Sequence, residues 1–105
     1  MANSIGIDEL KKMVSQGVAP TLLDVRRKSD YEAAPETIED ARWCDPETVD
    51  SWSGAIPGDR PVIVYCVKGG SVSQSVADRL SGKRVDVRYL EGGILAWNAA
   101  KGETG

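Results

Sequence analysis

Histidine is absent from this chain of 105 residues, and cysteine occurs only twice, as Cys44 and Cys66. Without an imidazole, no serine or cysteine nucleophile can be paired with a histidine base. A zinc site needs four ligands, usually cysteine and histidine, and the sequence offers no such cluster. These absences exclude the Ser-His and Cys-His mechanisms and predict a protein without a bound metal or other cofactor.

Long apolar runs and an excess of positive charge are also missing. No stretch approaches the roughly 20 apolar residues that span a bilayer, and residues 1–5 do not begin a signal peptide. Lys and Arg number 13 against 16 Asp and Glu, a net charge of −3, which disfavours sequence-independent binding to nucleic acid. Provided that Met1 is the native start, we expect a cytoplasmic protein with no membrane or nucleic-acid partner.

The length and composition suit one small globular domain. The chain is 41% hydrophobic and 28% charged, values typical of a soluble protein, and 105 residues are too few for two cores. We therefore predict a single domain over residues 1–105, with a frayed tail at about residues 101–105 and a monomeric state by default.

Helical and strand-like segments alternate along the chain, which predicts a parallel α/β sheet. Helices are expected between Gly6 and Gly17, over 30–34, 46–52 and 71–80, and after Gly93. Strands are expected over 21–25, 41–44, 61–65 and 86–90, the second of them at an edge.

Side chains that could take part in catalysis or ligand binding follow three of these strands. Cys66 ends one strand, Asp24 and Arg26 lie at the end of another, and Glu91 follows a third. Ligands of parallel sheets bind beyond the carboxyl ends of the strands. These features are therefore expected to lie along one edge.

Cys66 lies between the apolar strand and a short glycine loop that opens a helix. A free cysteine has a pKa of about 8.5, so only a small fraction is thiolate at neutral pH. The helix start, the loop N–H groups and the ammonium of Lys68 would all favour the anion. We therefore expect Cys66 to be substantially ionised near pH 7.

A thiolate in a cationic pocket favours an anionic substrate. With no histidine to donate a proton, the leaving group should be stable as an anion. Thiosulfate meets both conditions: the thiolate takes the outer sulfur, sulfite departs, and a second nucleophile such as cyanide or a thiol removes the sulfur from the persulfide.

The loop Cys66–Ser71 resembles the six-residue active-site loop of rhodaneses, the thiosulfate sulfurtransferases. Three further stretches agree with that family in order, Leu22–Arg26, Pro61–Cys66 and Leu90–Trp97. The resemblance covers nearly the whole chain. It implies a small rhodanese-like domain with a parallel sheet of about five strands and helices on both faces.

The same resemblance implies roles for the loop residues. Cys66 would carry the persulfide, and Lys68 matches a position where a cation favours thiosulfate over mercaptopyruvate. Ser71 stands where many members have arginine, and Glu36–Ala41 replaces a Gly-His-Ile-Pro-Gly-Ala run. The expected substrate-binding residues, through their N–H groups or charge, are Val67, Lys68, Gly69, Gly70 and Ser71.

Structural interpretations stand beside these roles. We favour Cys44 as a packed structural thiol, the alternative being a cysteine that resolves an intermediate on Cys66. Asp24 and Arg26 are expected to support the loop edge as an ion pair rather than to act in catalysis. Lys68 has the ordinary alternative of a solvated surface side chain.

Two other functions compete with sulfur transfer. A cysteine phosphatase would need a longer loop with arginine six positions after the cysteine, where this chain has Val72. A carrier or protein-binding module would pass persulfide sulfur to a protein acceptor, or bind a partner without chemistry. The sequence does not separate that module from an enzyme acting on a free donor.

Overall fold

Five strands form one parallel sheet in the computed structural model, which describes residues 3–18, 20–38, 41–56, 60–68, 70–81 and 86–103. Their order across the sheet is β1-β5-β4-β2-β3. The strands are β1 Asn3–Ile5, β2 Thr21–Asp24, β3 Arg42–Trp43, β4 Val62–Tyr65 and β5 Val87–Leu90. The predicted parallel α/β sheet of about five strands is confirmed, with β3 at an edge.

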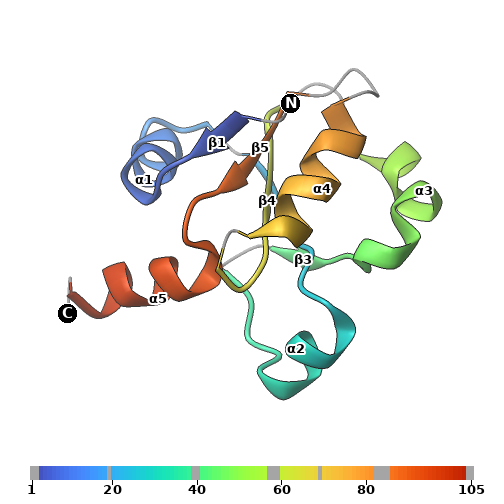
Figure 1. The fold of residues 1–105 in the computed structure, drawn as a ribbon. Coiled ribbons are helices and arrows are strands. Elements are labelled where there is room, and N and C mark those ends of the chain that lie inside the picture. The colour runs from blue at the N-terminus through green and yellow to red at the C-terminus, as the bar shows by residue number, and fades with distance from the viewer. Residues whose placement is uncertain are drawn as a thin grey trace.

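Helices cover both faces of this sheet (Figure 1). They are α1 Ile7–Ser15, α2 Lys28–Ala33, α3 Val49–Trp52, α4 Ser71–Ser81 and α5 Gly93–Glu103, with 3-10 turns η1 Pro46–Thr48 and η2 Ser53–Ala55. Helices α1 and α5 lie on one face, α3 and α4 lie on the other, and α2 lies below the sheet in this view. Helix α5 includes residues 101–103, which the sequence assigned to the frayed tail; residues 104–105 lie outside the described ranges.

The alternation of side chains along β4 fills two apolar clusters. Val62 and Val64 pack with Val76, Ala77 and Leu80 of α4, on the face that α3 and α4 cover. On the opposite face, a second cluster joins the sheet to α1 and α5; its buried members include Leu10, Ile63, Tyr65, Leu90 and Ile94. Because side chains alternate between faces, the residue after Tyr65 points toward α4.

Strand β1 is absent from the sequence prediction. It has three residues, of which Asn3 is exposed and Ile5 is buried, so it lacks the apolar run that marks β2 and β4. It pairs with β5 at the other edge, where Ile5 lies opposite Leu90. In the described ranges, no helix is long and apolar enough to cross a bilayer.

Candidate active site

Cys66 directly follows β4 at the carboxyl edge of the sheet, and 6% of its surface is exposed. Its thiol donates a hydrogen bond to the hydroxyl of Ser73 on α4, with an Sγ–Oγ distance of 3.2 Å. Cys44 packs in the apolar cluster under α4, but Cys66 belongs to neither cluster. The Cys66 sulfur therefore has a polar contact at the sheet edge, although it is largely buried.

Ser73 is the site residue that sequence reasoning missed. The apolar residues Val72, Val76, Ala77 and Leu80 predict one buried face for this helix, whereas the structure buries Ser73 in place of Val72. The spacing 73-76-77-80 fits one helix face equally well. A serine on a buried helix face needs a hydrogen-bond partner, and that requirement was the available signal.

The loop after Cys66 is open to solvent along most of its described length. Val67 is half-buried, whereas Lys68, Gly70 and Ser71 are exposed. Gly69, which the sequence included among the binding residues, lies outside the described residues. The described loop is therefore mostly exposed, whereas the cysteine that it follows is largely buried.

Helix α4 begins next to the Cys66 sulfur. Its first backbone bond runs from the N–H of Gln74 to the carbonyl of Gly70, at 3.2 Å. The amides of the preceding turn, including that of Ser73, therefore have no acceptor within the helix. Because Ser73 Oγ contacts the sulfur, the positive end of the α4 dipole lies on the sulfur's side, where it favours an anion.

The base of the loop is tied to α5 through its backbone. The N–H of Ile94 donates to the carbonyl of Cys66 at 2.9 Å, and that of Leu95 donates to Val67 at 3.2 Å. This contact requires glycine at position 93, because a Cβ there would lie 2.3 Å from the Cys66 carbonyl oxygen and the backbone has φ +58°. Gly93 thus permits a close approach of α5 to the Cys66–Ser71 loop.

Asp24 and Arg26 form a buried ion pair, with the closest atoms, Nη2 and Oδ2, 2.7 Å apart. The guanidinium also donates to the carbonyls of Ala34 and Glu36 at 2.8 and 2.9 Å, while the indole of Trp43 donates to the Arg26 carbonyl. Burial lowers the pKa of Arg26, but the hydrogen bond and charge of Asp24 outweigh it and leave the pKa raised. The pair therefore holds the segment after α2 in place.

Tyr65 connects this ion pair to the sheet on the face opposite the thiol. Its hydroxyl donates to Asp24 Oδ2 at 3.3 Å and accepts the N–H of Ile38 at 3.0 Å. Burial raises the pKa of Tyr65 well above its ordinary value of 10.0. Because Tyr65 packs under α1 and α5 whereas Cys66 contacts α4, the structure brings Asp24 and Arg26 to the same edge but not onto the sulfur.

Cys44 lies in the apolar cluster beneath α3 and α4 and is 9% exposed. Burial raises its pKa, an effect that nearby Arg42 partly opposes. Both cysteines are free thiols. Cys44 thus has the surroundings of a packing thiol.

Across the described parts of the chain, no group of three or more His, Cys, Asp or Glu side chains is arranged to hold a metal ion.

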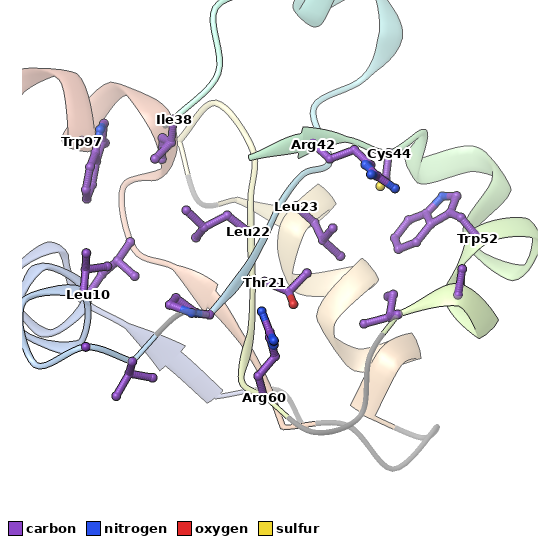
Figure 2. A pocket seen from close by; sticks show the side chains of 16 residues that line it. Leu10, Thr21, Leu22, Leu23, Ile38, Arg42, Cys44, Trp52, Arg60 and Trp97 are labelled. Atoms are coloured by element: carbon purple, nitrogen blue, oxygen red, sulfur yellow. The ribbon is translucent and has the colours of Figure 1, made fainter. Parts of the chain in front are cut away.

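A pocket of about 830 Å³ lies alongside β2 (Figure 2). Leu10 and Trp97 line it on one side of the strand, and Cys44 and Trp52 line it on the other. Cys66 is not one of its lining residues. This pocket is therefore separate from the candidate active site.

A smaller groove of about 510 Å³ reaches the end of the Cys66–Ser71 loop at Ser71. Its charged lining residues are Arg27, Lys28, Glu47 and Arg79. Arg79 is engaged in an exposed ion pair with Asp50 at 3.0 Å. Lys28 pairs with Glu32 at 3.9 Å, so two of the three cations that line the groove have acidic partners.

The rhodanese resemblance is confirmed by comparison with known proteins. Residues 6–100 match the Rhodanese-like domain family. A curated protein from Allochromatium vinosum, named a sulfurtransferase, is 30% identical over 97 residues, which cover 92% of this chain and 89% of that protein. The chain therefore belongs to the rhodanese family.

Solved structures share the same architecture. A rhodanese-related protein from Thermoplasma volcanium is 22% identical with a TM-score of 0.78, covering 93% of this chain and 92% of that one. A rhodanese homologue from Thermus thermophilus is 28% identical with a TM-score of 0.66, covering 87% of this chain and 95% of that one. The expected rhodanese-like fold is thus confirmed.

Proposed function

We propose that this protein is a sulfurtransferase that moves sulfane sulfur from thiosulfate, or a related anionic donor, through a persulfide on Cys66. The observation that carries the proposal is the position of the Cys66 sulfur, at the end of β4 and beside the first turn of α4, in a chain of the rhodanese family. The acceptor is a small nucleophile such as cyanide or a thiol. No cofactor takes part, and the protein acts as a cytoplasmic monomer.

The reaction has two displacement steps. The Cys66 thiolate attacks the outer sulfur of thiosulfate, the S–S bond of the donor breaks with its electron pair on sulfite, and Cys66 becomes a persulfide. Cyanide or a thiolate then attacks the terminal sulfur and restores the Cys66 thiolate. Neither step needs a histidine, because each leaving group departs as a stable anion.

Positive groups support an anionic donor at this site. Lys68 is exposed on the loop, where its ammonium can meet a doubly charged donor. The N–H groups of Val67, Gly70 and Ser71, with that of residue 69, are proposed to cradle the transferred sulfur. Asp24 and Arg26 support the loop edge from the opposite face and have no proposed contact with the donor.

The phosphatase alternative has less support. Residues 66–78 contain no arginine, and Arg79 is engaged by Asp50 on the exposed side of α4. A bound phosphate would therefore lack the bidentate guanidinium that such enzymes use. The remaining alternative is a persulfide carrier that serves a protein acceptor and has little activity on free substrates.

Thiocyanate formation from thiosulfate and cyanide tests the proposal. We expect activity in the wild type and in Cys44→Ala, and none above background in Cys66→Ala. A persulfide on Cys66 without thiocyanate turnover would favour the carrier. Activity that survives in Cys66→Ala, or the absence of both signals in the wild type, would overturn sulfur transfer through this residue.

A further inference from the structure

We propose that Ser73 is a positioning residue for the Cys66 thiolate: its hydroxyl turns to donate to the sulfur when the thiol loses its proton. This inference rests on the proposed function, since it concerns the nucleophile of that reaction. Ser73 is wholly buried, and its Oγ lies 3.2 Å from Cys66 Sγ. It belongs to α4 rather than to the Cys66–Ser71 loop, so the loop sequence does not identify it.

The hydrogen bonds around Ser73 show how its hydroxyl can rotate when Cys66 loses its proton. In the neutral state the Cys66 thiol donates to Ser73 Oγ, and the Ser73 hydroxyl donates to the carbonyl of Gly70 at 3.4 Å. Once Cys66 is a thiolate, it has no proton and becomes an acceptor only. A rotation of one hydroxyl hydrogen then turns the existing contact into a bond to the anion.

This rotation has a small free-energy cost, because the Gly70 carbonyl that loses the Ser73 hydroxyl keeps another hydrogen-bond donor. The N–H of Gln74 donates to Gly70 at 3.2 Å, as part of the α4 ladder. The bond released is long, and the bond gained goes to a charged sulfur, which makes it the stronger of the two. Ser73 therefore favours the thiolate over the thiol, and in the persulfide it can hold the inner sulfur in the same place.

Other charged groups near this edge are directed elsewhere or lie in the loop itself. Asp24 and Arg26 pair on the face opposite α4. Glu91, after β5, accepts a hydrogen bond from Ser4 at 2.8 Å. Lys68 is the charged side chain of the Cys66–Ser71 loop, and it is unchanged in the variants below.

The test compares Ser73→Ala with Ser81→Ala, another serine on α4 whose hydroxyl bonds to a helix carbonyl, that of Ala77, at 2.9 Å. Both variants are made in a Cys44→Ala background, and the rate of iodoacetamide alkylation of Cys66 is measured across a range from mildly acidic to alkaline pH. Urea unfolding of each variant checks that the fold is kept, which is expected because Gly70 retains its bond from Gln74.

Removing the Ser73 hydroxyl should move the alkylation profile to higher pH. At pH 7 the rate should fall about three- to tenfold, the loss of thiolate being partly offset by the greater nucleophilicity of a more basic sulfur. At high pH the Ser73→Ala rate should equal or exceed that of the parent. The Ser81→Ala profile should superimpose on the parent.

Two results would overturn the proposal: a Ser73→Ala profile identical to the parent, or a rate lowered by one constant factor at every pH. The second would mean that Ser73 affects access or packing only. Alkylation needs no sulfur donor, so the alkylation profile is independent of whether thiosulfate forms a persulfide in the wild type. Failure of the proposed function would instead appear when persulfide formation from thiosulfate is measured.

Discussion

The carboxylate of Asp24 meets the guanidinium of Arg26 at 2.7 Å, and their side chains are 0% and 3% exposed. Removing one partner of such a pair leaves a buried charge uncompensated. We therefore expect Asp24→Asn to lower the free energy of unfolding by about 3–5 kcal/mol. Urea denaturation measures this directly.

The exposed ion pair between Arg79 and Asp50 provides the control for that substitution. Its side chains are 52% and 74% exposed, and Asp50→Asn should change the unfolding free energy by less than about 1 kcal/mol. Equal effects of Asp24→Asn and Asp50→Asn would contradict the structural role assigned to the buried pair.

Tyr65 is predicted to contribute stability in a pH-dependent way. Tyr65→Phe leaves the N–H of Ile38 without its acceptor, at a cost of about 1–3 kcal/mol near neutral pH. Burial raises the pKa of Tyr65 above 10.0 in the folded protein. The stabilisation that Tyr65 provides is therefore complete below pH 10 and is lost as pH rises further. Above pH 10 the unfolded chain gives up the phenolic proton of Tyr65, whereas the folded chain retains it.

The measurement for Tyr65 is the difference in unfolding free energy between wild type and Tyr65→Phe, followed from neutral pH into alkali. That difference should narrow above pH 10. A difference that stays constant, or widens in alkali, would show that Tyr65 does not retain its proton in the folded state.

Gly93 is predicted to be intolerant of any side chain. In Gly93→Ala the new Cβ would meet the Cys66 carbonyl and the backbone would keep a positive φ, so we expect a loss of about 1–3 kcal/mol of stability. Sulfur transfer should also fall, since α5 would be pushed from the loop. Gly54→Ala is the matched control, because nothing lies within 4 Å of the position that a Cβ would take there; wild-type behaviour in Gly93→Ala would refute the close contact.

The two cysteines should differ in reactivity although their exposed fractions are alike, 9% for Cys44 and 6% for Cys66. The raised pKa of Cys44 means that it remains a thiol at pH 7 and gains reactivity only in alkali. Mass mapping after brief iodoacetamide treatment at pH 7 should find the label on Cys66 first. Equal labelling of both residues would show that the site does not activate Cys66.

The strongly patterned parts of this fold could be predicted from the sequence. The apolar run Val62–Tyr65 becomes the buried strand β4, and the glycine loop places Cys66 at its end, as expected. Strand β1 could not be found in this way, because it is three residues long and only Ile5 is buried. Its pairing depends on β5, which lies near the other end of the chain.

The candidate site was predictable only in part. The loop motif identified Cys66, but the hydrogen bond to Ser73 depends on which of two adjacent residues α4 turns toward the sheet. Likewise, the strand ends placed Asp24 and Arg26 at the correct edge, but the hydrogen bond from Tyr65 to Asp24 joins residues that are far apart in the sequence. Both facts come from tertiary packing, which the spacing of residues does not determine.

The most direct test of the account is the intact mass of the protein after brief treatment with thiosulfate, followed by peptide mapping. We predict a mass increase of one sulfur atom, located on Cys66, lost on addition of cyanide and absent in Cys66→Ala. A wild-type protein that stays unmodified, or that carries the sulfur on Cys44, would contradict it.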